Sequence, residues 1–170
     1  MHAVVVIESC FGNTAKVAEA IIEGMRSSGA EVQTYPAGSA PCRLSAQLLL
    51  VGAPTHNMGL PTKSSRAQAA AKGGTAPETG VREWIETVEE LDGRVVTFST
   101  TTGGILAGSA GKAIVKGLRR RKTRAEHGAD FTVNGTPGPV ADGELERARQ
   151  WGRTLVTEGR RATSTAGVLR

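Results

Sequence analysis

Cysteine is scarce in this chain, aromatic residues make up only 4% of it, and no long apolar run occurs. Its two cysteines, Cys10 and Cys42, are too few for a disulfide framework. Neither has a Cys or His two to four residues away, so we expect no metal site. No stretch approaches the roughly 20 apolar residues that cross a bilayer, and we expect no membrane insertion. The N-terminus leads into "HAVVVIES" without a signal-like charged segment and cleavage site, so we expect a cytoplasmic protein.

The composition is that of an ordinary globular protein, with 39% hydrophobic and 22% charged residues. A chain of 170 residues is long enough to bury one substantial core. We therefore predict a single domain over residues 1–159 and a disordered C-terminal tail over residues 160–170. The net charge is +5, but residues 1–60 contain three Lys or Arg side chains against four acidic ones. The excess of positive charge therefore lies in the later part of the chain.

Short apolar runs alternate with amphipathic stretches. Strands are predicted at about 3–7, 31–35, 48–53, 94–98 and 130–133, and helices at about 14–26, 81–92, 109–121 and 143–158. This alternation predicts an α/β fold with a doubly wound, five-stranded parallel sheet and helices on both faces. Ligands of such sheets bind beyond the carboxyl ends of the strands, so the loops after the first, third and fourth strands are the candidate sites.

The first of these loops, "SCFGNT", joins a predicted buried strand to the start of a helix. Free backbone N–H groups and the helix dipole favour an anion there, and a phosphate is the natural ligand. Ser9, Asn13 and Thr14 add polar donors, and Gly12 permits a positive φ. The loop has neither a "GK[ST]" nor a "GxGxxG" pattern. The same residues would also suit a turn in which Asn13 or Thr14 merely caps the helix, and the pattern does not separate the two interpretations.

Three loops, taken in order, resemble the flavin loops of the flavodoxin-like family. "SCFGNT" resembles the phosphate loop, in the variant with an aromatic third residue found in flavodiiron proteins and in small actinobacterial family members. "LLLVGAPTHNMGLP" at residues 48–61 resembles the second flavin loop, and the segment beginning "STTTGG" at residue 99 resembles the third. The resemblance implies the sheet order 2-1-3-4-5 and a bound FMN whose ribityl phosphate lies on the first loop.

The resemblance also implies which residues bind the cofactor, with no catalytic side chain and no metal ion among them. These residues are Ser9, Cys10, Phe11, Gly12, Asn13, Thr14, Pro54, Thr55, His56, Asn57, Met58, Gly59, Ser99, Thr100, Thr101, Thr102 and Gly103.

The second loop departs from the pattern of long-chain flavodoxins, which sandwich the flavin between Trp and Tyr. This loop has His56 and Met58 instead, whereas Trp84 and Trp151 fall on apolar helical stripes and are expected in the core. By the resemblance, the backbone of residues 57–59 offers a carbonyl to the flavin N5–H, and Met58 could cover a flavin face.

Two further side chains of these loops allow both a functional and a plain interpretation. We expect His56 to contact the FMN, where a protonated imidazole would stabilise an anionic reduced flavin, although a loop histidine is often merely solvated. We expect Cys10 to be a small buried filler rather than a thiol of lowered pKa, with only its backbone N–H near the ligand.

Two other segments stand apart from the three loops. Residues 62–80 are too long for a simple connection and predict an added flap or short helix, in which Lys63 and Arg66 could steer an anionic substrate or a nicotinamide nucleotide. Seven Lys or Arg side chains crowd residues 112–124. The "RRRK" cluster at residues 119–122 falls at the C-terminus of a crossover helix, at the edge of the sheet opposite the flavin, so we expect it neither to border the flavin nor to dock an electron-transfer partner over it. We interpret the run as solvated charge at a helix C-terminus rather than as a nucleic-acid site.

Three functions are compatible with the sequence. The leading hypothesis is an FMN-binding redox protein that transfers electrons between a reductase and an acceptor protein. The second is an FMN-dependent NAD(P)H:quinone-type oxidoreductase, and the third is a flavin-free binding module that uses the basic helix. Because few acidic residues surround the predicted flavin site, we also expect little like-charge repulsion of a reduced flavin anion.

Overall fold

The computed structural model describes residues 1–104 and 106–168, and from residue 162 onward it describes the backbone alone. Its five strands are β1 (His2–Ile7), β2 (Glu31–Pro36), β3 (Arg43–Pro54), β4 (Glu90–Thr101) and β5 (Glu126–Thr132). Its α-helices are α1 (Asn13–Ser27), α2 (Lys63–Ala71), α3 (Val81–Thr87), α4 (Ala110–Arg120) and α5 (Glu144–Val168), with a 3₁₀ turn at Ala37–Ser39.

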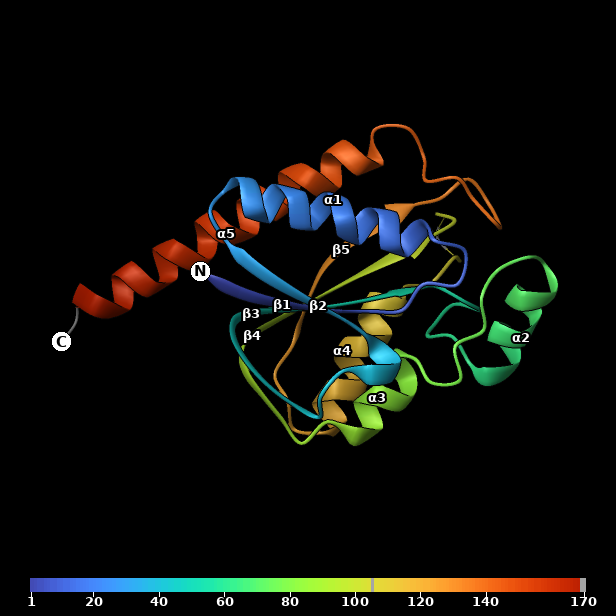
Figure 1. The fold of residues 1–170 in the computed structure, drawn as a ribbon, viewed down its shortest axis with the longest axis horizontal. Helices are drawn as coiled ribbons and strands as arrows, with labels where there is room; N and C mark the ends of the chain where they lie inside the picture. Colours follow the sequence, from blue (N-terminus) through green and yellow to red (C-terminus); the bar gives the residue numbers. More distant parts are fainter. Residues whose placement is uncertain (105, 169–170) are drawn as a thin grey trace.

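The strands form one parallel sheet in the order β2-β1-β3-β4-β5 (Figure 1). The β-branched run of β1 lies between β2 and β3 and is almost fully buried, as expected of a strand that is covered on both faces. The predicted fold class, strand order and parallel sheet are therefore confirmed.

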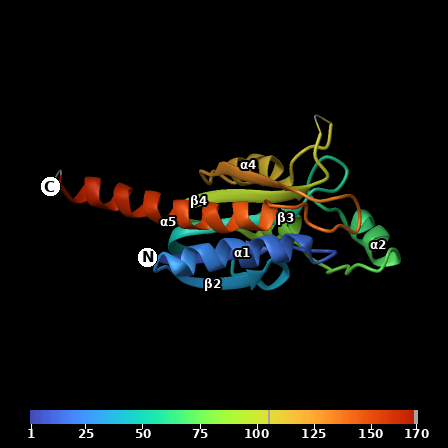
Figure 2. The same ribbon diagram turned by 90° about the horizontal axis from the view of Figure 1, so that it is seen from above.

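Helices cover both faces of the sheet, and each face has its own core. On one face α3 and α4 pack on side chains such as Val4, Val51 and Val95. On the other face α1 and α5 pack on side chains such as Val5, Leu50 and Phe98 (Figure 2). Trp84 is buried in the first core, and Trp151 packs edge-on against Phe98, so both tryptophans serve the core as predicted.

Two glycines allow α1 and α5 to approach closely. A Cβ on Gly24 would lie 1.9 Å from the carbonyl oxygen of Arg149, and one on Gly152 would lie 2.1 Å from that of Ile21. The two helices therefore pack backbone against backbone, which fixes α1 and the loop that precedes it.

Two predicted helices end at other residues in the structure. The expected helix at 81–92 ends at Thr87, because Leu91 pairs with Leu44 and extends β4 alongside β3. Long-range strand pairing thus overrides a helical apolar pattern. The helix expected at 143–158 continues to Val168, in a stretch that has no proline to end it, and residues 169–170 of the expected tail lie outside the described part. None of the helices in the described residues is both long and apolar enough to cross a membrane.

Gly52 in β3 offers a test of packing at the centre of the sheet. A Cβ at this position would lie 2.1 Å from Cζ of the Phe98 ring. We expect Gly52→Ala to lower the free energy of unfolding by about 1–3 kcal/mol, because Phe98 is fully buried and must shift. Denaturant titration measures the change. The control Gly59→Ala, where nothing lies within 4 Å of the new Cβ, should change stability by no more than about 0.5 kcal/mol. Equal effects of the two substitutions would contradict this account.

Candidate functional site

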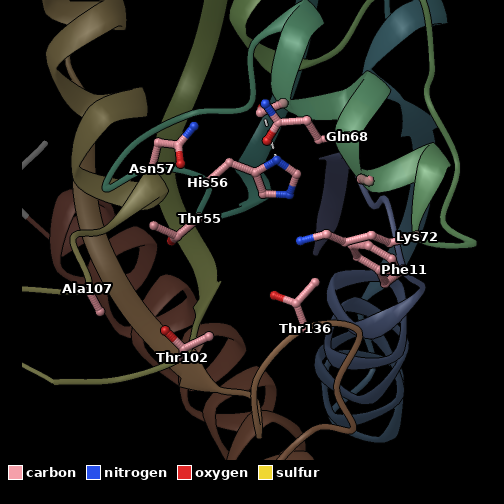
Figure 3. Close-up of a pocket in the computed structure, with 11 residues that line it drawn as sticks. Phe11, Thr55, His56, Asn57, Gln68, Lys72, Thr102, Ala107 and Thr136 are labelled. Atoms are coloured by element: carbon pink, nitrogen blue, oxygen red, sulfur yellow. Dashed lines mark hydrogen bonds between the residues drawn. The ribbon is translucent and has the colours of Figure 1, made fainter.

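A hollow lies at the carboxyl edge of the sheet, where the three predicted loops meet. Its main part has a volume of about 250 Å³ and is lined by residues of the first, second and third loops together with α2 (Figure 3). A smaller part of about 50 Å³ continues between the first loop and the ends of β3 and β4. We call the two parts together the cavity. No Asp or Glu is among its lining residues.

The first loop reaches α1 through a left-handed glycine. Gly12 occupies the N-cap position with φ +83° and has no side chain with which to cap the helix. The simpler interpretation, a turn in which Asn13 or Thr14 caps α1, is not what the structure shows, because both residues lie inside the helix. A helix start behind a positive-φ residue is a typical anion-binding concavity.

The polar side chains of the first loop already have partners within the protein. Ser9 Oγ accepts a bond from the backbone N–H of Ala15 at 3.3 Å, and the hydroxyl groups of Thr14 and Thr100 bond at 2.8 Å. Asn13 Nδ2 donates to the carbonyl oxygen of Pro137 at 2.6 Å. These bonds hold the loop in shape, and an anion would meet mainly its backbone N–H groups.

The Asn13–Pro137 bond brings in a fourth loop, at residues 133–140 after β5, that the sequence analysis did not include. Thr136 of this loop lines both parts of the cavity. The segment "NGTPGP" gave no sign of this role, because the contact with Asn13 spans 124 residues of sequence.

The second loop makes a tight reversal over residues 56–59. His56 and Gly59 exchange both backbone hydrogen bonds at 2.9 Å, while Asn57 and Met58 lie between them with φ +47° and +67°. Asn tolerates this left-handed conformation, but Met does so at a cost of about 1–3 kcal/mol. The Met58 side chain is 62% exposed and does not line the cavity, so in this structure it does not form the cover that the sequence suggests.

His56 lies in the cavity wall and contacts α2. Its Nδ1 bonds to the hydroxyl group of Ser65 at 3.0 Å. Burial lowers the pKa of the imidazole below its usual value, and the nearby Glu8 carboxylate only partly offsets this. In this structure burial therefore favours the neutral imidazole, and a protonated His56 beside a reduced flavin stays a prediction.

A buried ion pair fixes α2 beside β1. The Arg66 guanidinium donates from Nε to Glu8 Oε1 at 2.6 Å and from Nη2 to Glu83 Oε2 at 2.6 Å. The side chains of Arg66 and Glu8 are each only 1% exposed. Arg66 therefore cannot steer an anionic substrate as expected, because it is buried and its charge is neutralised by the carboxylates of Glu8 and Glu83.

A second anchor joins the end of α2 to the first loop. The backbone N–H of Thr75 donates to the carbonyl oxygen of Cys10 at 2.7 Å, and its hydroxyl group reaches the carbonyl oxygens of Ser9 and Cys10 at 3.2 Å. The segment at residues 62–80 is thus hydrogen-bonded to the first loop, and we call it the roof of the cavity.

One face of α2 forms this roof. Ser65, Gln68, Ala69 and Lys72 line the cavity, and the Lys72 side chain points into it from the side opposite Thr55 (Figure 3). The sequence analysis missed these residues. Their spacing of three, four and seven positions is a helical stripe, and that signal could have found them.

Burial also settles the role of Cys10. The side chain is 2% exposed, and burial raises the pKa of its thiol to about 11, with a smaller contribution from the Glu8 carboxylate. The thiol is therefore a protonated filler at neutral pH, in line with the expectation.

The third loop contributes only some of its predicted residues. Thr102 and Ala107 line the main part of the cavity, and Thr100 and Thr101 line the smaller part. The Ser99 hydroxyl group instead is fully buried and bonds to Asp130. Gly108 packs on Met58, which joins the second and third loops, and Ile105 lies outside the described residues.

The structure brings most, but not all, of the predicted residues to the cavity. The lining residues among them are Phe11, Asn13, Thr14, Pro54, Thr55, His56, Asn57, Thr100, Thr101 and Thr102. The predicted residues that do not line it are Ser9, Cys10, Gly12, Met58, Gly59, Ser99 and Gly103. These seven residues belong to the same three loops but lie outside the cavity lining.

Comparison with known proteins identifies the fold through solved structures. No protein-family model matches the chain, and no curated protein matches its sequence. Among solved structures, a flavodoxin from the domain Archaea aligns with a TM-score of 0.61 at 17% identity, over 94% of this chain and 99% of that one. At such identity the likeness shows the fold, which is flavodoxin-like.

Two larger proteins contain a similar unit. The flavodiiron protein of Giardia intestinalis aligns with a TM-score of 0.56 at 21% identity, over 96% of this chain and 36% of that one. A flavone reductase aligns with a TM-score of 0.58 at 13% identity, over 94% of this chain and 63% of that one. The same fold thus forms most of a flavodoxin and only part of these two proteins.

The lowered pKa of His56 predicts how stability depends on pH. As the pH falls, the unfolded chain takes up this proton before the folded protein does, so stability that is complete above about pH 7 declines toward about pH 5. We expect His56→Gln to flatten this part of the profile. Urea titrations at several pH values measure it.

The matched control is His2→Gln at an exposed position, which should leave the slope unchanged. A wild-type stability that rises on acidification between pH 7 and 5 would contradict the neutral, buried imidazole.

Proposed function

We propose that this protein binds one FMN noncovalently in the cavity and transfers electrons between a reductase and an acceptor. The observation that supports this most is the cavity itself, which joins the N-terminus of α1 to the two following loops and has no acidic lining residue. Its place beyond the strand ends, on a flavodoxin-like fold, agrees with this proposal.

The residues present suit such a ligand. The backbone N–H groups behind Gly12, at the dipole end of α1, would hold the phosphate group. Phe11 and the Thr100–Thr102 segment would line its middle part, and Thr55, His56 and Asn57 would border the ring. Bound FMN would supply reversible transfer of one or two electrons.

The chain's own groups would then position and shield the cofactor. The neutral His56, held by Ser65, offers a hydrogen-bonding ring nitrogen without adding charge. Gln68 and Lys72 close the cavity from α2 and restrict water above it. The finer assignments, a small actinobacterial-type flavodoxin and a cytoplasmic location, belong to the same proposal.

The role of the first loop predicts a strong preference for FMN over riboflavin. Each charge-assisted hydrogen bond to the phosphate contributes about 1.5–3 kcal/mol, so we expect FMN to bind at least about tenfold more tightly. Titration of the apoprotein with each flavin, followed by fluorescence quenching, measures the ratio. Equal affinities for FMN and riboflavin would contradict the proposal that the first loop binds the phosphate.

Charge variants on and beside α2 sharpen this experiment. Lys72→Gln should weaken FMN binding about two- to fivefold and riboflavin binding less, because an exposed ammonium group contributes modestly. Lys63→Gln removes an equal charge at an exposed position that does not line the cavity, and should have no measurable effect.

A second candidate function is an FMN-dependent NAD(P)H:quinone-type oxidoreductase. The roof favours it, since α2 adds polar groups and a cation beside the cavity where a small anionic substrate could bind. Mixing the FMN-loaded protein with NADPH alone separates the two functions. A carrier should keep its oxidised flavin spectrum for minutes without a reductase, whereas rapid stoichiometric bleaching would establish the enzyme.

A further inference from the structure

A cationic groove runs along α4 beside β5. The hollow between α4 and β5 has a volume of about 650 Å³ and is lined by Lys112, Lys116, Arg119, Arg120, Val115 and His127. The four cations are exposed, and their spacing places them on one face of α4 while Ile114 and Leu118 bury the other face. We call this hollow the basic groove.

The cations of the basic groove are not neutralised by the fold. Elsewhere in the described residues, exposed arginines such as Arg43, Arg94 and Arg147 form ion pairs with glutamates. None of the four groove cations forms an ion pair within the described part of the chain. Four unpaired positive charges within about 12 Å of helix repel one another, so binding of an anionic partner would lower this electrostatic repulsion.

The acidic residue nearest to the groove is already engaged. Asp130 accepts bonds from the hydroxyl groups of Ser99 and Ser109, and its Oδ2 lies 3.1 Å from Nε2 of His127. An extra residue at Gly128 bulges β5, so that His127 and Asp130 share the face of the sheet that α4 covers. Asp130 is thereby turned toward the serines behind the groove, and its charge does not satisfy the lysines and arginines in front.

The groove begins beside the cavity. Ser109 caps α4 by accepting a bond from the N–H of Lys112 at 3.2 Å, and the N–H of Ala110 donates to Thr55 Oγ1 at 3.0 Å. Thr55 lines the cavity, and Lys112, the first cation of the groove, lies within one helical turn of Ala110, which bonds to Thr55. The start of the basic run therefore lies beside the cavity, whereas the "RRRK" cluster at residues 119–122 lies at the C-terminal end of α4.

The lining of the groove argues against nucleic acid as the partner. No aromatic side chain lines it to stack on bases. A protein surface can instead place separate carboxylates over the four cations.

We propose that the basic groove docks an acidic protein surface, namely that of the redox partner. The partner's carboxylates lie along α4, and its contact extends over the third loop to the mouth of the cavity. Complementary charge of this kind speeds association and orients the partner. The identity of the partner as a redox protein rests on the proposed function, whereas the acidic chemistry of the docked surface rests on the groove alone.

The test uses a fluorescein-labelled helical peptide of about 20 residues, with glutamate at every third and fourth position, and the full-length protein. Anisotropy titrations at about 50 and 200 mM salt measure its affinity. We expect salt-sensitive binding, which Lys116→Gln with Arg120→Gln weakens at least about tenfold. The control pair Lys122→Gln with Arg124→Gln removes the same charge just beyond the groove and should weaken binding no more than about twofold.

Three results would overturn the proposal. These are no binding of the peptide, equal losses in the two double variants, and tighter binding of a labelled DNA duplex that the groove variant abolishes. FMN titration of the same proteins separates the two levels of inference. Peptide binding without FMN binding leaves a basic groove that docks an acidic surface and removes the redox function. FMN binding without peptide binding leaves the redox function and removes the docking proposal.

Discussion

The buried ion pair between Glu8 and Arg66 is the interaction on which the arrangement of the cavity depends. Taking two charges out of water costs several kcal/mol per ion, and such a pair persists only if further hydrogen bonds satisfy both groups. Here Glu8 Oε2 also accepts from the N–H of Val81 at 2.8 Å, while Arg66 also donates to Glu83. The end of β1, the roof helix and the start of α3 are thus joined at one point. Because the pair tolerates few alternative geometries, it contributes more to the placement of α2 than to net stability.

Other contacts at the cavity follow from that placement. With α2 fixed, Ser65 reaches His56 and Thr75 reaches the carbonyl groups of the first loop. The roof is therefore hydrogen-bonded to both the first and the second loop. The same packing removes Arg66 from solvent and lowers the pKa of His56, so the cavity keeps a single cation, Lys72, and no acid among its lining residues.

The sequence predicted what local patterns encode. The apolar runs of β1 and β3 and the small polar loops after them were readable, because strand burial and turn chemistry act over a few residues. Partners distant in sequence were not readable. Arg66 looked like a solvent-facing cation because Glu8 lies 58 residues away, and the loop at residues 133–140 was passed over because its contact is Asn13. Leu91 had the spacing of a helix and became a strand residue only because Leu44 was there to pair with it.

The bulge at Gly128 has a consequence for how this fold can change. A parallel strand without it would turn His127 and Asp130 to opposite faces of the sheet, since side chains alternate along a regular strand. Loss of one residue would therefore disconnect the polar cluster behind α4 from the wall of the basic groove, while leaving every helix in place. The exact number of residues in β5 therefore decides which side chains reach the surface beside it.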